Sequence, residues 1–100
     1  MHIYQTAHFK VRGEALGICE QAIREFIAYV KETETGTLLY ESWQQVDDST
    51  SFVHNFIFES EEARQIHRTS AGVMRFTSTL YPHLLAPVEF TDYTLLATTA

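Results

Sequence analysis

The chain has 100 residues, of which 45% are hydrophobic and 20% are charged, a composition typical of one globular domain. Seven Lys and Arg against 13 Asp and Glu give a net charge of −6. This balance argues against nucleic acid and anionic membrane surfaces as partners, because both require a basic face. Cys19 is the only cysteine, so an intrachain disulfide is excluded. The first residues lack the basic start and apolar stretch of a signal peptide, and no apolar run reaches the roughly 20 residues of a membrane helix, so we expect a cytoplasmic protein.

The first half of the chain predicts a strand, a helix and a strand hairpin. Residues 2–11 alternate in the manner of a strand, which Gly13 ends. Residues 37–46 and 51–59 predict two strands joined by a turn at Asp47-Asp48-Ser49. Between them, residues 14–31 predict an amphipathic helix because apolar residues recur at helical spacing. This stripe contains Ala15, Ile18, Cys19, Ala22, Ile23, Phe26, Ile27 and Val30, and it makes Cys19 an inert core residue.

The second half predicts helical segments followed by a last strand. Ser60 is expected to cap a helix that runs to about Ser70, with Glu61 and Glu62 at its positive end. Gly72 is expected to break it before a second helical piece at residues 73–80. Pro82 and Pro87 bracket a loop, and residues 88–97 predict a strand.

The element order β-α-β-β-α-β indicates a single ferredoxin-like α+β domain over residues 1–100, with a four-stranded antiparallel sheet whose first and third strands are central. Helices can cover only one face of such a sheet, yet the strands are apolar on both faces. We therefore expect a homodimer formed by packing sheet on sheet. Trp43 is expected to anchor this interface, with the wall of a ligand cavity as the alternative. His8 is expected on the same side as the dimer partner, while His2 and His83 are expected at the surface and in a loop.

Four local motifs carry a resemblance to a known family. They are residues 34–40 entering the second strand, residues 47–52 at the hairpin, Glu61-Glu62-Ala63 through His67 to Ser70, and Leu80 to Pro87. In this order the chain resembles the antibiotic biosynthesis monooxygenase superfamily, whose fold is a dimeric α+β barrel. The superfamily includes cofactor-independent monooxygenases that oxidise quinols or anthrones with molecular oxygen, haem-degrading enzymes and a group similar to sugar-phosphate isomerases.

The sequence departs from this family at four residues, Phe56, His67, Phe76 and Thr77. Phe56 stands where many members carry a glutamate in the third strand, which removes any mechanism that depends on that carboxylate. The haem-degrading members have an Ala-His pair where this chain has Phe76 and Thr77, and a tryptophan where it has His67. These departures from the haem-degrading members imply that haem ligation by the residue at this position, Thr77, is absent.

Three polar residues are candidates for catalysis. His67 lies beside the apolar stripe of its helix and is either a general acid or base, or a half-buried histidine bonded to a backbone carbonyl. His54 shares its strand face with aromatic residues and is either a polar group of a pocket or a satisfied core residue. Tyr40, in the adjacent strand, could position a phenolic substrate. The expected pocket wall is formed by Phe52, Phe56, Phe58 and Phe76.

No metal or cofactor is predicted. The five histidines form no HxH, HxxH or HExxH spacing, and no glycine-rich phosphate or dinucleotide motif is present. The first functional hypothesis, which the resemblance implies and the missing motifs agree with, is a cofactor-independent monooxygenase acting on a small quinol- or anthrone-like aromatic. The alternatives are a non-catalytic dimeric binding or stress-related module, and a sugar-phosphate isomerase using Arg64, Arg68 and Arg75 near His67.

Overall fold

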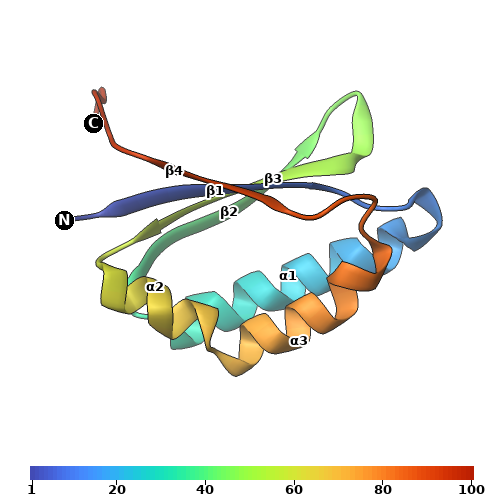
Figure 1. Ribbon diagram of the computed structural model, residues 1–100, viewed down its shortest axis with the longest axis horizontal. Helices are drawn as coiled ribbons and strands as arrows, with labels where there is room; N and C mark the ends of the chain where they lie inside the picture. Colours follow the sequence, from blue (N-terminus) through green and yellow to red (C-terminus); the bar gives the residue numbers. More distant parts are fainter.

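The computed structural model describes all 100 residues as two layers, an antiparallel sheet with helices on one face (Figure 1). The sheet order is β2-β3-β1-β4, so the first and third strands are central, and the predicted ferredoxin-like α+β fold is confirmed. The elements are β1 (Ile3–Lys10), α1 (Leu16–Thr33), β2 (Thr37–Gln45), β3 (Asp48–Phe58), α2 (Glu61–Arg68), α3 (Ala71–Leu80) and β4 (Glu89–Tyr93), with 3-10 turns at Gly13–Ala15 and Tyr81–His83.

The face of the sheet that the helices cover, the inner face, is formed by alternate residues of the two central strands. Ala7 pairs with His54 and Phe9 with Phe52 across β1 and β3, and all four side chains are buried. Because side chains of a strand alternate between faces, the same parity also brings Phe56 and Phe58 inward. The inner face is therefore aromatic along most of β3.

Helix α1 supplies the opposing layer of the core, and its apolar stripe forms largely as predicted. Cys19 is fully buried, and it shares one core cluster with Ile23 of the same helix and with Phe9 and Leu80. Ile18 is the exception, because 56% of it is exposed. The stripe that contacts the sheet is thus narrower than the sequence pattern indicated.

The break between the two later helices lies at Ser70 rather than at Gly72. The Ser60 hydroxyl accepts a hydrogen bond from the Ala63 amide at 3.1 Å, which confirms the predicted cap of α2. Ser70 does the same for α3 through the Val73 amide at 3.1 Å. Gly72 lies inside the first turn of α3, where a side chain would collide with the Tyr29 ring.

Two predicted strand boundaries were wrong. β3 begins at Asp48, which pairs with Gln45 of β2, so this residue belongs to the strand rather than to the turn. Its carboxylate accepts hydrogen bonds from the Thr50 and Ser51 hydroxyls and from the Lys10 ammonium. β4 ends at Tyr93, which pairs with Tyr4. The register would set residues 95–97 beyond the start of β1, which begins at Ile3, so they have no strand partner.

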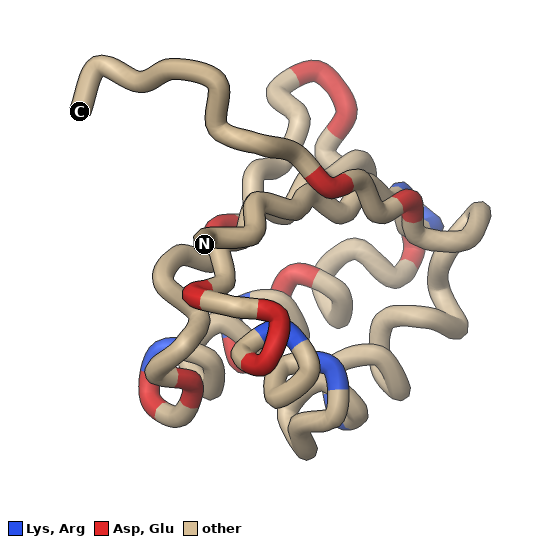
Figure 2. Tube along the Cα trace, turned by 60° about the vertical axis from the view of Figure 1, so that its left-hand side comes forward, with Lys and Arg blue, Asp and Glu red and all other residues tan.

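The other, outer face of the sheet is uncovered in the single chain. The register places Tyr4, Leu39, Trp43, Val53, Ile57 and Tyr93 on it together with His8. Five of the seven Lys and Arg residues lie in the helices, where acidic residues are interspersed with them (Figure 2). No helix is long and apolar enough to span a membrane.

Candidate functional site

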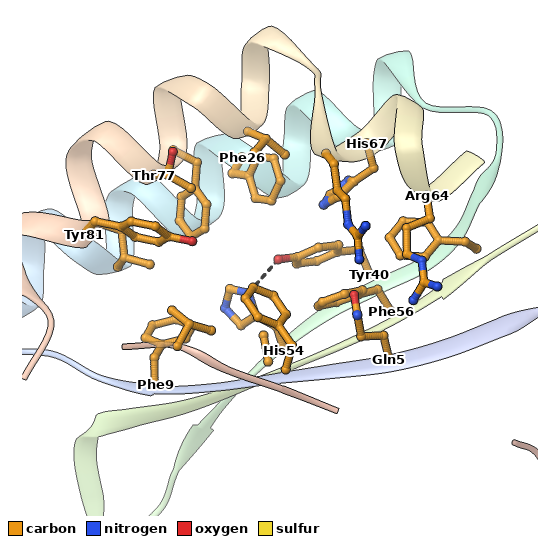
Figure 3. A pocket seen from close by; sticks show the side chains of 18 residues that line it. Gln5, Phe9, Phe26, Tyr40, His54, Phe56, Arg64, His67, Thr77 and Tyr81 are labelled. Carbon is orange, nitrogen blue, oxygen red and sulfur yellow. Dashed lines mark hydrogen bonds between the residues drawn. The ribbon is translucent and has the colours of Figure 1, made fainter. Parts of the chain in front are cut away.

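A cavity of about 340 Å³ lies between the inner face of the sheet and the three helices (Figure 3). It is lined by 18 residues, of which 12 are hydrophobic. Phe26 and Phe76 stack with ring centroids 4.5 Å apart on the helical side, and Tyr40 and Phe56 stack at 4.9 Å on the sheet side. Such a space, apolar with a few polar groups, is the usual form of a small-molecule site.

His67 stands at one end of this cavity and is bonded to a buried carboxylate. Its Nδ1 lies 2.8 Å from Oε1 of Glu34, and the Thr37 hydroxyl donates to the same oxygen at 2.7 Å. Both residues are buried: 8% of His67 and 9% of Glu34 is exposed. His67 Nε2 has no partner in the chain, yet it is not among the fully enclosed polar atoms. This nitrogen is therefore the one that a molecule in the cavity can reach.

The local packing that brings Glu34 and His67 together depends on Gly36. A Cβ atom at Gly36 would lie 2.6 Å from the Cβ of Ala63, so glycine permits the close approach of α2 to the loop before β2. Ala63 and His67 are four residues apart and share one face of α2. The close contact at Ala63 thus places His67 against the same loop one turn later.

Tyr40 and His54 form the second polar group of the cavity. The Tyr40 hydroxyl lies 2.7 Å from His54 Nδ1, as the dashed line in Figure 3 shows. Burial lowers the pKa of His54 to about 3, so its imidazole is neutral at ordinary pH. Burial, with the nearby Glu34 and Tyr81 as smaller causes, raises the pKa of Tyr40. The pair is consequently a neutral hydrogen-bonded unit, and His54 is too weak a base to hold a proton near pH 7.

A network of charged and amide side chains lies at the edge of the cavity beside β4. Arg64 donates to both carboxylate oxygens of Glu61 and to Asp92 at 2.9 Å, and Gln5 donates to the other oxygen of Asp92 at 2.8 Å. The network joins β1, β4 and α2. Arg68 also lines the cavity and makes no hydrogen bond or ion pair within the chain, so it is the cation there that remains free for a ligand.

The structure brings most of the predicted site residues together. His67, His54, Tyr40, Phe56, Phe58 and Phe76 all line the cavity. Phe52 does not, because it stacks on Phe9 at 5.4 Å in the core. Trp43 and His8 lie on the outer face, away from this cavity, and Arg75 lies over the Tyr29 ring instead of beside His67.

Sequence reasoning missed Glu34, the partner of His67 behind the cavity wall, and some residues of the wall itself. Glu34 carried no signal of burial, since it follows α1 directly and resembles an ordinary polar helix end. Gln5 and Phe26 sit on an inner strand face and a helix stripe, where the pattern indicates burial but cannot separate a cavity wall from a filled core. No group of three His, Cys, Asp or Glu side chains is arranged to hold a metal ion.

Comparison with known proteins identifies the family. The profile of the antibiotic biosynthesis monooxygenase family matches residues 2–78. The chain belongs to the antibiotic biosynthesis monooxygenase family. The matched residues of this family member carry both histidine pairs, Glu34 with His67 and Tyr40 with His54, whereas Tyr81 and β4 lie beyond them.

Solved structures agree with this fold. One is a candidate antibiotic biosynthesis monooxygenase from Bacteroides thetaiotaomicron, with 15% identity over 99% of this chain and 93% of that chain and a TM-score of 0.91. Rv0793 from Mycobacterium tuberculosis has 20% identity over the full length of both chains and a TM-score of 0.89. PA3566 from Pseudomonas aeruginosa has 21% identity over 96% and 95% of the chains, with a TM-score of 0.86. At these low identities the structural similarity supports only the fold of this family member, and not a shared activity. Among curated proteins, none matches the chain.

Proposed function

We propose that this protein is a cofactor-independent monooxygenase that oxidises a small quinol- or anthrone-like aromatic with molecular oxygen. The observation that carries the proposal is the accessible Nε2 of His67 at the wall of an aromatic cavity of about 340 Å³. Stacked aromatic rings on both sides suit a flat apolar molecule. Membership of the antibiotic biosynthesis monooxygenase family supports the same class of reaction.

In this proposal His67 acts as the general base. With an anthrone-like substrate its Nε2 takes a proton from the activated CH₂ group, which leaves an electron-rich aromatic anion. The anion transfers an electron to O₂, and recombination of the two radicals forms a carbon–oxygen bond. His67 returns its proton to the outer oxygen, giving a hydroperoxide. Loss of the second C–H proton and cleavage of the O–O bond then give a carbonyl and water, so CH₂ and O₂ become C=O and H₂O.

Tyr40 and His54 are proposed to position the substrate. If His54 Nδ1 donates to the Tyr40 oxygen, the Tyr40 O–H is free to donate to a substrate oxygen in the cavity. This tautomer leaves only a lone pair, rather than an N–H donor, on the enclosed and unpartnered Nε2 of His54. Arg68 is the cation available to an ionised substrate oxygen, since Arg64 is already paired with Glu61 and Asp92.

The alternative functions are less well supported by the geometry. A sugar-phosphate isomerase needs a cationic pocket, but Arg75 lies elsewhere and Arg64 is paired. A non-catalytic module would be favoured by a filled core, whereas the space between sheet and helices is open.

The test is oxygen uptake by the purified protein with a panel of hydroquinones and anthrones and no added cofactor. His67→Asn removes the base but keeps an amide N–H at the position of Nδ1, which can still donate to Glu34. We expect turnover by the wild type and a loss of about 10²–10⁴-fold in His67→Asn. His2→Asn, at an exposed position, is the matched control and should retain full turnover. Equal turnover in His67→Asn would overturn the assignment of the base, and no uptake with any compound of the panel would count against the reaction.

We also propose a homodimer that covers the outer face. Trp43 and Tyr93 are 57% and 53% exposed there, beside Leu39, Val53 and Ile57. A sheet face that leaves this many large apolar side chains uncovered is characteristic of an interface. Light scattering at micromolar concentration should give twice the chain mass, and Trp43→Arg should reduce it; a monomeric wild type would contradict the proposal.

A further inference from the structure

We infer that Glu34 is the positioning residue of this site, and that its carboxylate fixes His67 in the tautomer whose Nε2 accepts a proton from the substrate. The inference rests on the proposed function for its catalytic consequence. Its structural part, the state of the His67 imidazole, stands independently of any reaction.

The bond between Glu34 and His67 determines which nitrogen of the imidazole carries the proton. An ionised carboxylate can only accept hydrogen bonds, so His67 Nδ1 must be the donor across the 2.8 Å contact. In the neutral imidazole the other nitrogen, Nε2, then holds a lone pair. Because Nε2 is the nitrogen that remains accessible at the cavity, the lone pair is presented where a substrate would bind.

The location of Glu34 is energetically costly, which argues that the residue has a specific role. It directly follows α1, where the negative end of the helix dipole disfavours an anion. It is also buried, with 4% of its side chain exposed, and burial disfavours a charged carboxylate. Within the chain only Thr37 and His67 offset these costs.

The two carboxylate oxygens of Glu34 are bonded unequally, and the stability of the buried charge depends on His67. Both donors bind Oε1, whereas Oε2 is enclosed and has no partner. When His67 takes a proton, the resulting imidazolium becomes the only cation in direct contact with this carboxylate. The carboxylate therefore favours the protonated state that follows proton abstraction, and charge-assisted hydrogen bonds of this kind are roughly twice as strong as neutral ones.

Two variants separate the charge of Glu34 from its role as an acceptor. Glu34→Gln keeps an oxygen that can accept from both His67 and Thr37, but it is uncharged. Glu34→Met has a similar length and neither a charge nor an acceptor. Glu32→Gln, on the exposed last turn of α1, removes the same charge from the surface and is the control.

The first measurement is the tautomer of His67, read from the nitrogen chemical shifts of its ring by NMR near neutral pH. We expect the Nδ1–H form in the wild type, in Glu34→Gln and in Glu32→Gln, and the Nε2–H form in Glu34→Met. An Nε2–H imidazole in the wild type, or an unchanged Nδ1–H form in Glu34→Met, would overturn the inference.

The second measurement is kcat with a substrate from the oxygen-uptake panel. Glu34→Gln should lower kcat on the order of tenfold through the lost charge, with KM little changed. Glu34→Met should be as slow as His67→Asn, because in this variant Nε2 of His67 already carries a hydrogen and cannot accept the substrate proton. A wild-type kcat in Glu34→Gln would overturn the charge effect, and this variant decides the question if Glu34→Met fails to fold. If no compound is oxidised while the tautomers follow the expected order, the positioning of His67 holds and the proposed reaction is rejected.

Discussion

The two histidines of the cavity are both buried, with 1% of His54 and 8% of His67 exposed, but they have different partners, and the partner determines what each can do. His54 is bonded to the phenol of Tyr40, and burial lowers its pKa to about 3, so it stays neutral and serves as a packed polar group. His67 is bonded to the carboxylate of Glu34, and its second nitrogen remains accessible. Burial alone therefore does not identify a catalytic histidine. A catalytic histidine is identified by the chemistry of the group bonded to Nδ1 and by the accessibility of Nε2.

The largest expected difference between the two histidines is in stability. His54→Ala should lower the free energy of unfolding by about 2–4 kcal/mol, because it leaves a cavity and removes the partner of the Tyr40 hydroxyl. His67→Asn should cost no more than about 1 kcal/mol, because its amide can still donate to Glu34. Urea unfolding measures both values. Equal losses, or a larger loss in His67→Asn, would remove the distinction between a structural and a functional histidine.

A second difference appears when the pH is lowered. Between pH 6.5 and about 3 the unfolded chain binds a proton at His54 that the folded chain does not bind. The free energy of unfolding therefore falls as the pH drops below 6.5, by at most about 1.4 kcal/mol per pH unit from this residue, and the loss ends near pH 3.

Measuring the free energy of unfolding of wild type and His54→Ala at several pH values isolates the contribution of His54. The carboxylates of the chain titrate in both proteins, so their effects largely cancel in the difference. The gap in stability between wild type and His54→Ala should shrink by about 2.5 kcal/mol between pH 7 and pH 4.5. A gap that stays constant across this range would mean that folded His54 takes up a proton as readily as the unfolded chain does.

The periodicity of the sequence predicted the fold because each element has one apolar face of regular spacing. It also predicted the neighbourhood of His67, His54 and Tyr40, since strand parity and helix position place them on the covered side of the sheet. It could not predict Glu34. The burial of that side chain depends on how closely α2 approaches the loop before β2, a tertiary distance set by Gly36 and Ala63. Phe52 and Phe56 likewise share the same strand parity, so the sequence could not distinguish them. In the structure only Phe56 faces the cavity, because Phe52 packs in the core.

The smallest expected effect concerns the two tyrosine hydroxyls of the cavity. Tyr40→Phe removes the hydroxyl bonded to His54 and should lower the free energy of unfolding by about 1 kcal/mol. Tyr81→Phe is its matched control, since Tyr81 also lines the cavity but its hydroxyl has no hydrogen-bond partner in the chain and 47% of the residue is exposed. This variant should unfold at the same urea concentration as the wild type.

If Tyr40 also positions a substrate oxygen, Tyr40→Phe should raise KM more than it lowers kcat, because the lost hydrogen bond contributes to binding while His67 still removes the proton. A fall in kcat as large as that of His67→Asn would instead place Tyr40 in the proton transfer itself. Such a result would contradict the separate roles of the two pairs, in which Tyr40 and His54 stabilise the fold and position the substrate, while His67 with Glu34 transfers the proton.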